Sequence, residues 1–429
     1  MMTVSEWLKS VMVSPDAYDA DILLQSFLDE MTKGLNGDPS SLLMFPAYVD
    51  TTHAVPQDTP VAVIDAGGTN LRVCVARLNA EHESELSDFT KQPMPGRDHE
   101  VEPADFYGVL ADALEPFADA FDSIGFCFSY PAEITPDCDG RLLHWTKEIK
   151  IPGLVGQQVG AGLLAELNAR GLNGKKIVVL NDTVATLLAG LATGQAFNAS
   201  SYIGLILGTG TNTAYVEQNA NIGKVELGEG TQVINTESGA FAAFERGPFD
   251  LQLDAESESP NTHVFEKVIS GVYMGPLALK LLQALATDSA HLSESGAAAL
   301  LDMQELTTIH IDNLAADNGR DVGVLADDVF SDADRDVMRE VFTAVVRRAA
   351  LFTAVNLAAA VVKSGAGTDP NSPVCINIDG STYYKTYQLE ASVQAHLEAL
   401  LDARGLYCRC IQVDDAPVVG AAIAGLTVS

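Results

Sequence analysis

Basic side chains are scarce in this sequence. Lysine and arginine together number 25 against 58 aspartates and glutamates, which gives the 429-residue chain a formal net charge of −33. A surface that binds nucleic acid neutralises phosphates with basic residues, and an anionic membrane attracts basic segments, so this charge disfavours both partners. A ligand that carries phosphate would have to be bound by backbone N–H groups, a metal ion and a few local cations.

Long apolar runs are also missing. No stretch reaches the ~18 apolar residues of a membrane-spanning helix, and residues 1–10 contain Glu6 and Lys9 instead of the apolar core of a secretion signal. The eight histidines show no paired spacing, and Cys408 and Cys410 form a C-x-C without the second pair that a zinc site needs. We therefore expect a cytoplasmic protein with reduced thiols and no zinc site.

The acidic composition itself suggests a habitat. So acidic a surface repels itself at low salt. We therefore hypothesise that the protein comes from a saline or salt-accumulating cell. Thermal stability that stayed flat or fell between low and molar salt would count against this hypothesis.

Length and composition favour more than one domain. A chain of 429 residues is too long for one ordinary core, and its hydrophobic content of 47% is typical of globular proteins. An apolar stripe through Ile22, Phe27 and Met31 predicts an early helix that ends at Gly34. Later helices are expected over residues 262–285, 336–363, 390–401 and 417–426.

A buried strand that ends in polar residues stands near the middle of the chain. The β-branched run from Ile177 to Leu180 stops at Asn181-Asp182-Thr183, and a helical pattern follows. Parallel α/β sheets bind their ligands at the carboxyl ends of strands, where a carboxylate can accept a proton from a substrate hydroxyl. The alternative is that these residues only cap the helix.

Two glycine-rich turns each join a pair of strands. Residues 61–64 lead into Asp65-Ala66-Gly67-Gly68-Thr69-Asn70, and residues 202–207 lead into Gly208-Thr209-Gly210-Thr211-Asn212, each followed by an alternating strand. A dinucleotide-binding motif or a P-loop would need a helix after the turn. The turns can therefore be ordinary tight turns, or they can bring backbone amides close to a phosphate.

A third glycine turn differs because a helix follows it. Residues 376–379 form a predicted strand, and Gly380-Ser381 then opens a probable helix, which suits contact with a nucleotide. The first two turns lie 141 positions apart (208 − 67) and suggest two similar α/β units. Three such turns favour a nucleotide cleft between two domains.

Taken together and in order, these motifs resemble the hexokinase family, of the eukaryotic hexokinase/glucokinase type, over roughly residues 34–425. The motifs that carry the resemblance are Ser41-Leu42-Leu43-Met44, Asp65 to Arg72, Phe128-Ser129-Tyr130-Pro131, Leu142 to Lys147, Leu180 to Thr183, Gly204 to Asn212, Asn235-Thr236-Glu237, Phe265-Glu266-Lys267 with Tyr273-Met274-Gly275, and Asp379-Gly380-Ser381.

The resemblance implies a two-domain α/β fold of the actin-like ATPase (ribonuclease H-like) class, with a sugar–ATP cleft between the domains. The small domain would hold residues 60–180 plus 414–429. The large domain would hold residues 1–59 plus 181–413.

The resemblance also implies roles for individual residues. Asp182 would be the general base, with Lys147 and Arg72 supplying positive charge in the catalytic set. The residues implied to bind sugar hydroxyls are Ser129, Thr146, Lys147, Asn181, Asp182, Asn212, Glu237 and Glu266. Those implied to contact ATP are Asp65, Gly67, Gly68, Thr69, Asn70, Arg72, Gly208, Thr209, Gly380 and Ser381. Asp65 would lie near Mg²⁺, in contact through water.

The implied activity is transfer of the γ-phosphate of ATP to the 6-hydroxyl of glucose, and of mannose or fructose, as the first step of glycolysis. The implied partners are a hexose and ATP, in a monomer or homodimer without nucleic acid or membrane. The main alternative is a hexokinase-like sugar sensor that has kept the fold but little catalysis. An actin- or chaperone-type ATPase is a second alternative.

Several positions depart from the family pattern. Ser238 stands where the family usually has Trp, which we expect to loosen the packing behind Glu237. Val272 replaces a common Lys and removes a possible contact to ATP. Glu148 follows Lys147 where Gly is common, and Asp414-Asp415-Ala416-Pro417 replaces the usual Gly-Ser-Gly before the last helix.

Overall fold

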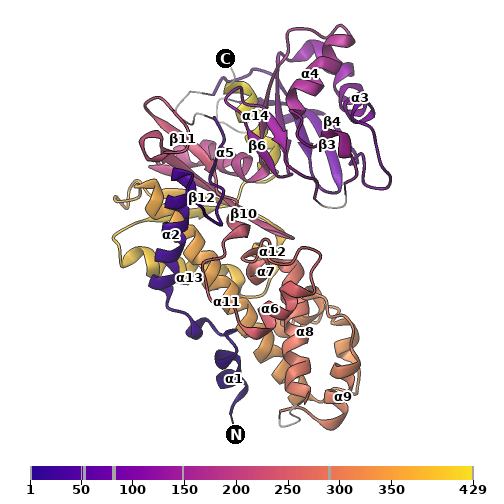
Figure 1. Cartoon of the computed structure of the whole chain (residues 1–429), viewed down its shortest axis with the longest axis vertical. Coiled ribbons are helices and arrows are strands. Elements are labelled where there is room, and N and C mark those ends of the chain that lie inside the picture. Colours follow the sequence, from indigo (N-terminus) through magenta and orange to yellow (C-terminus); the bar gives the residue numbers. More distant parts are fainter. Residues whose placement is uncertain are drawn as a thin grey trace.

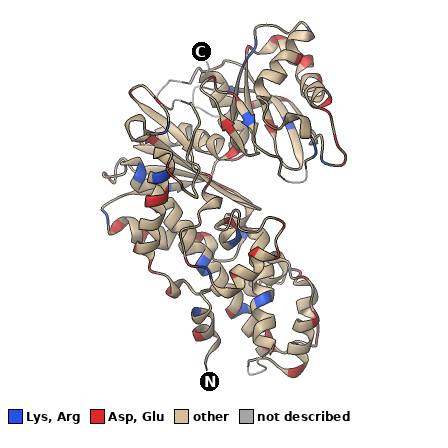
Figure 2. Ribbon diagram, in the orientation of Figure 1, with Lys and Arg blue, Asp and Glu red and all other residues tan. Residues whose placement is uncertain are grey.

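The structure is a computed structural model that describes residues 2–49, 51, 55–79, 84–146, 149–287 and 291–427. Two β-sheets organise these residues (Figure 1). The smaller sheet lies toward one end of the molecule with the C-terminus, and the larger one lies at the centre, with a long helical region extending from it toward the N-terminus. Acidic residues, red in Figure 2, are spread over both regions.

The five-stranded sheet has the order β4-β3-β2-β5-β8. Its strands are β2 (Val61–Ala66), β3 (Asn70–Leu78), β4 (Ser84–Pro93), β5 (Ser123–Phe128) and β8 (Lys176–Leu180). β2, β5 and β8 run parallel, and the β2–β3 pair is the predicted hairpin. The carboxyl ends of β2 and β8 consequently lie at one edge of the sheet, which brings Asp65 toward Asp182. A separate hairpin joins β6 (Ala132–Ile134) and β7 (Gly140–Leu142).

The six-stranded sheet has the order β1-β11-β10-β9-β12-β13. Its strands are β1 (Phe45–Pro46), β9 (Ser201–Leu207), β10 (Thr211–Gln218), β11 (Thr231–Asn235), β12 (Val374–Asp379) and β13 (Cys408–Ile411). β9 and β10 form the second predicted hairpin, and β12 lies parallel to β9. The glycine turn after β9 and the one after β12 therefore end neighbouring strands.

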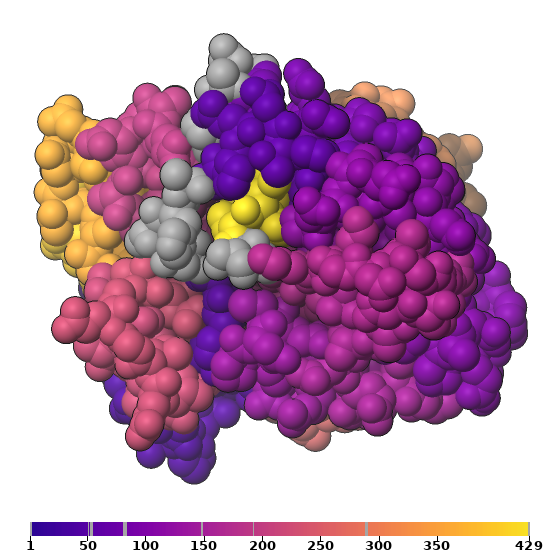
Figure 3. All heavy atoms as spheres, turned by 90° about the horizontal axis from the view of Figure 1, so that it is seen from above, coloured from indigo at the N-terminus to yellow at the C-terminus, as the bar shows by residue number. Residues whose placement is uncertain are grey.

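Two helices connect the sheets. α5 (Asp182–Gln195) and α14 (Ala416–Thr427) share one apolar cluster with residues from both sheets. α14 is built of small residues because it crosses other backbone closely: a Cβ on Gly420 would lie 1.8 Å from the carbonyl oxygen of Ala185, and one on Gly125 would lie 1.8 Å from that of Ala421. Seen from above, yellow spheres near the C-terminus lie in a recess beside indigo and purple segments from the first half of the chain (Figure 3). The outer face of the small sheet packs against α3 (Pro103–Leu114) and α4 (Val159–Ala169).

The long helix α11 (Asp332–Ser364) forms the centre of the helical region. It is long and apolar enough to cross a membrane by composition, but 89% of its apolar window is buried by protein, as the prediction of a core helix requires. The helices around it are α1 (Val4–Ser10), α2 (Ala20–Asn36), α6 (Pro248–Ala255), α7 (Glu266–Ile269), α8 (Gly271–Thr287), α9 (Glu294–Asp302), α10 (Thr308–Ala316), α12 (Ser381–Lys385) and α13 (Leu389–Asp402). Short 3₁₀ helices span Pro15–Ala17, Glu115–Ala120, Pro152–Leu154, Asn219–Asn221, Ser238–Ala240 and Gly323–Ala326.

Two predicted helix boundaries were wrong. α2 ends at Asn36, with Gly37 at φ +79° as its C-cap, and Gly34 lies inside the helix because Leu42 and Met44 pack closely against it. The helix predicted over 262–285 is divided into α7 and α8, since Ser270 is extended (ψ 154°). The division of the chain into domains at residues 60, 180 and 414 stays a prediction.

Candidate active site

Asn181 and Asp182 occupy the junction between β8 and α5. Asn181 is the N-cap, and its Oδ1 accepts the backbone N–H of Thr183 at 2.9 Å. Asp182 is the first residue of the helix, and its Oδ1 accepts only the hydroxyl of Thr183, at a long 3.3 Å, among the hydrogen bonds of the described residues. The cap and the site are therefore compatible interpretations: the asparagine caps the helix, and the aspartate beside it remains available for chemistry.

A second carboxylate, Asp65, lies opposite Asp182 at the end of β2. Its Oδ2 is paired with Nη2 of Arg72 at 2.7 Å, and Arg72 Nη1 lies 3.3 Å from Oδ1 of Asp415. Burial raises the pKa of Asp65, the charge of Asp182 raises it further, and the Arg72 guanidinium acts in the opposite direction. Arg72 is thus held between two carboxylates, one from each end of the chain.

Asp379, at the end of β12, belongs to the same group. Burial is the main cause of its raised pKa, and the charges of Asp182, Arg72 and Asp415 also act on it. Neither Asp379 nor Asp415 was predicted as a site residue, although Asp379 belongs to the motif Asp379-Gly380-Ser381 and Asp415 to the segment that departs from the family pattern before the last helix. Within the described ranges no three acidic, histidine or cysteine residues are close enough to hold a metal ion directly.

A chain of amide side chains extends from Asn181 into the large sheet. Nδ2 of Asn212 donates to Oδ1 of Asn235 at 2.7 Å and lies 3.5 Å from Oδ1 of Asn181. Nδ2 of Asn235 in turn donates to Oε1 of Glu237 at 2.8 Å. Asn235 was missed as a site residue, and its place within Asn235-Thr236-Glu237 is the signal that could have found it.

Glu237 ends this chain, and a second glutamate, Glu266, lies near it. Glu266 accepts the backbone N–H of Thr211 through Oε2 at 3.0 Å. Burial raises the pKa of Glu237 to about 7, and the charges of Asp182 and Glu266 also raise it, which places all three carboxylates near one another. Glu237 has a left-handed backbone conformation (φ 56°), which is uncommon for a residue other than glycine.

The glycine turns adopt the tight geometry that the sequence predicts. The N–H of Gly67 donates to the carbonyl of Asn70 at 3.1 Å, and that of Gly208 donates to the carbonyl of Gly210 at 2.9 Å. Gly380 has φ +125°, and a Cβ there would lie 2.2 Å from the carbonyl oxygen of Leu207, so only glycine fits. The turns at 208 and 380 therefore touch each other at the ends of β9 and β12.

The site thus brings a chain of amide side chains and a group of charged side chains together at the edges of the two sheets. Models described as hexokinase match residues 4–192 and 202–427. The chain belongs to the hexokinase family. Glucokinase-1 of Kluyveromyces lactis is 32% identical over 405 residues, which cover 84% of this chain and 84% of that protein. Hexokinase-like 1 protein of Arabidopsis thaliana is 30% identical over 87% of this chain and 80% of its own length.

Among solved structures, the hexokinase of Schistosoma mansoni complexed with glucose is similar over 99% of this chain and 100% of its own, with a TM-score of 0.78 and 25% identity. This similarity confirms the predicted two-domain α/β fold, which is consistent with the actin-like ATPase class. Membership of the hexokinase family supports sugar phosphorylation as the general activity.

Not every residue implied by the hexokinase pattern is tied into this network. Lys147 and Glu148 lie outside the described residues. Ser129 directly follows β5 and its N–H donates to the carbonyl of Ala66, while Thr146 is half-buried beside the undescribed pair. Gly68 and Asn70 are half-buried in the first turn; Thr69, Thr209 and Ser381 are exposed.

The departures from the hexokinase pattern have different consequences. Ser238 is fully buried, its N–H donates to Oδ1 of Asn212 at 3.2 Å, and its hydroxyl bonds that of Thr213 at 3.2 Å. These two hydrogen bonds tie Ser238 to Asn212 and Thr213, and the expected loosening of the packing behind Glu237 stays a prediction. Val272 is 49% exposed, and Asp415 has become a partner of Arg72.

Proposed function

We propose that this protein is an ATP-dependent hexokinase that transfers the γ-phosphate of ATP to the 6-hydroxyl of glucose, and of mannose or fructose. The observation that carries the proposal is the position of Asp182, beside Asn181 and within the electrostatic reach of Glu237 and Asp65. It is a carboxylate between a set of hydroxyl-binding side chains and a set of phosphate-binding turns. Neither an ATPase without a sugar nor a simple binding protein needs this combination.

The sugar is proposed to bind the large-sheet side. Asn212, Glu237 and Glu266 offer oxygen and nitrogen atoms that suit hydroxyl groups, which both donate and accept hydrogen bonds. The hydrogen bonds from Asn235 and from the Thr211 backbone fix the two glutamates before a ligand arrives. A site built in this way rejects analogues that lack a hydroxyl, since its polar groups would then lose their partners.

The reaction needs a proton acceptor at one atom. As the 6-oxygen of the hexose bonds to the γ-phosphorus, its proton passes to the carboxylate of Asp182, and the bond from that phosphorus to the β,γ-bridging oxygen breaks to release ADP. Asp182 is suited to this role because Asn181, and not Asp182, caps α5. Arg72, supported by Lys147, supplies positive charge for the phosphoryl group.

ATP is proposed to lie along the glycine turns, with its phosphates near Gly67 to Asn70 and near Gly208 and Thr209, and its adenosine end near Gly380 and Ser381. Mg²⁺ bound with the nucleotide would neutralise charge on the phosphates. Asp65 suits such an ion, because its carboxylate can contact the ion through a water molecule. Among the described residues, no group of three or more acidic, histidine or cysteine residues forms a separate metal site. We also propose that the protein is cytoplasmic and acts at the first step of glycolysis.

The proposal is tested by measuring ADP formation with Mg²⁺ and glucose, mannose, fructose or N-acetylglucosamine, each at low and molar salt. Turnover that depends on one hexose, with little hydrolysis of ATP in its absence, is the expected result. Glucose binding by calorimetry without turnover on any sugar would favour the sensor instead. ATP hydrolysis that no sugar stimulates would favour the actin- or chaperone-type ATPase.

A further inference from the structure

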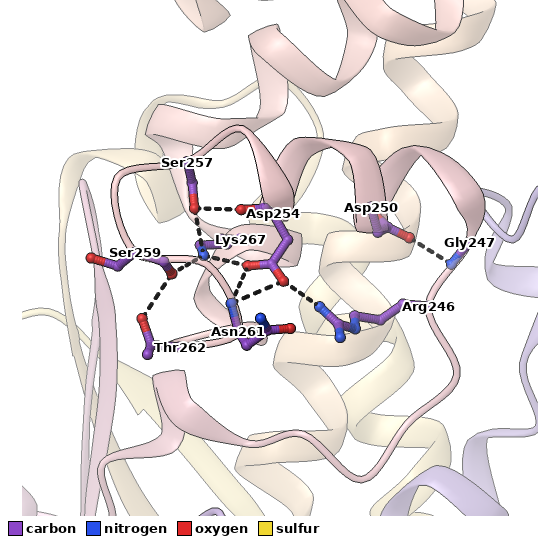
Figure 4. Close-up of polar contacts among 9 residues, drawn as sticks. All are labelled: Arg246, Gly247, Asp250, Asp254, Ser257, Ser259, Asn261, Thr262 and Lys267. Atoms are coloured by element: carbon purple, nitrogen blue, oxygen red, sulfur yellow. Dashed lines mark hydrogen bonds and ion pairs between the residues drawn. The ribbon is translucent and has the colours of Figure 1, made fainter.

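One buried carboxylate joins three separate segments of the large domain. Asp254, in the last turn of α6, is 4% exposed. Its Oδ1 is paired with Nζ of Lys267 at 2.5 Å, its Oδ2 with Nη1 of Arg246 at 2.8 Å, and both oxygens accept the backbone N–H of Asn261 at 3.1 Å (Figure 4).

The ammonium group of Lys267 has three hydrogen-bond partners. Besides Asp254, its ammonium donates to Oγ of Ser257 at 2.9 Å and to the carbonyl of Ser259 at 2.7 Å, and the residue is only 6% exposed (Figure 4). Lysine is seldom buried, and a buried ion pair is often no more stabilising than an apolar pair of the same size. A geometric role explains such a cluster better than stability does.

The two cations stand at the ends of segments that carry the sugar-facing glutamates. Lys267 directly follows Glu266 at the start of α7, a helix of four residues whose N-cap makes no side-chain hydrogen bond. Arg246 ends the irregular segment that begins at Glu237. These segments also touch near the site, because a Cβ on Gly239 would lie 3.5 Å from Cβ of Glu266.

We propose that Asp254 is a positioning residue for sugar binding, which holds Glu237 and Glu266 at a fixed separation through Arg246 and Lys267. The inference rests on the proposed function. Asp254 acts indirectly. It fixes the backbone on which each is carried, while the Thr211 N–H and the Asn235 amide orient the two carboxylates themselves.

The test is the isosteric variant Asp254→Asn in the full-length protein. It leaves the buried Lys267 and the partly exposed Arg246 without their counter-charge, so both segments shift. Because a displacement of about 1 Å in a site can cost about 10²-fold, we expect the KM for hexose to rise by about 10-fold to 100-fold. The KM for ATP and the kcat at saturating hexose should change less than the hexose KM, since the shifted segments reach the turn at 208–212 through the hydrogen bond between Glu266 and the N–H of Thr211 and hold both proposed sugar-binding glutamates.

Glu256→Gln is the matched control. Glu256 lies two residues further on, at the C-cap of α6, and is ion-paired with Lys280 on the side of α6 and α8 where a cavity of about 730 Å³ lies. The variant removes one ion pair from the same turn without reaching either glutamate. Its KM for hexose should equal that of the wild type.

A second variant, which keeps the Asp254–Lys267 ion pair, tests the inference even if Asp254→Asn does not fold. Arg246→Gln leaves the Asp254–Lys267 pair intact and should raise the hexose KM by a smaller factor, about 3-fold to 10-fold. An unchanged hexose KM in folded Arg246→Gln, or equal hexose KM values in Asp254→Asn and Glu256→Gln with only the thermal stability lowered, would overturn the inference. A wild type that binds no hexose by calorimetry would instead overturn the proposed function, and the inference with it.

Discussion

The two sides of the candidate site hold their polar groups by different means. On the side of the small sheet, Arg72 lies between Asp65 and Asp415, and ion pairs dominate. On the side of the large sheet, neutral amides form a hydrogen-bonded chain from Asn212 to Asn235 to Glu237. The difference matches the two proposed ligands: a phosphoryl group requires charge neutralisation, and a sugar requires directional hydrogen bonds.

The comparison also shows how a chain of net charge −33 can bind a polyphosphate. Arg72 is paired to two carboxylates, and backbone N–H groups in three glycine turns offer further donors without charge. On the proposed function, Arg72 exchanges a carboxylate partner for phosphate. The charged side therefore rearranges on binding, whereas the amide side is already organised.

The largest effect is expected on the charged side, from Arg72→Gln. Loss of the guanidinium removes positive charge beside the transferred phosphoryl group and leaves Asp65 buried without its partner. We expect kcat to fall by about 10²-fold to 10³-fold while hexose binding by calorimetry changes little. Arg77→Gln, an exposed position on the same strand β3, is the control and should have wild-type turnover. Equal losses in both variants would remove the special role of Arg72.

A smaller effect, mainly on the hexose KM instead of kcat, is expected on the amide side, from Asn235→Ala. The variant removes the link between Asn212 and Glu237, so the hexose KM should rise by about 10-fold or more with kcat much less affected. Asn313→Ala removes a buried amide in α10, outside the site, and serves as the control. A fall in kcat without a rise in KM would mean that the two sides do not divide the work as proposed.

The buried Glu237 should make the stability of the sugar-free protein depend on pH. Its pKa is raised from an ordinary value of 4.5 to about 7, so the folded state keeps a proton that the unfolded state has lost. The stabilisation is complete below about pH 4.5 and is lost as the pH rises to about 7, by roughly 3 kcal/mol at most. Glutamine stays neutral like the protonated carboxyl, so denaturant unfolding should show the wild type losing stability relative to Glu237→Gln as the pH rises across this range. A difference independent of pH would contradict the raised pKa.

Salt should raise the stability of the protein mainly by screening charges over its whole surface, and less by acting on either side of the site. Screening of a net charge of −33 reduces self-repulsion, so the melting temperature should rise between low and molar KCl. A constant or falling melting temperature would reject the hypothesis of a saline habitat.

The sequence predicted those parts of this arrangement that depend on local signals. Both hairpins, the helix after Gly380 and the cap at Asn181 follow from residue types within a few positions, and all are present. The grouping of Asp182 with Glu237 and Glu266 followed from the resemblance to hexokinases and not from spacing.

Other features depended on contacts between distant segments. Asp415 pairs with Arg72 across 343 positions, a link that no local pattern carries. The break at Ser270 separates α7 from α8 inside an uninterrupted helical pattern, and the strand β4 is exposed along nearly its whole length and shows no apolar alternation. Such elements are defined by what they pack against, so a single sequence does not reveal them.

The central claim is that Asp182 accepts the proton of the sugar, and Asp182→Asn tests it most directly, with kcat and the calorimetric Kd for glucose measured on the same preparation. Asparagine keeps the size and hydrogen-bonding reach of the side chain but does not act as a base. The account predicts glucose binding within about threefold of the wild type and a kcat lower by about 10²-fold to 10⁴-fold. A variant that binds glucose normally and turns over at near wild-type rate would contradict it.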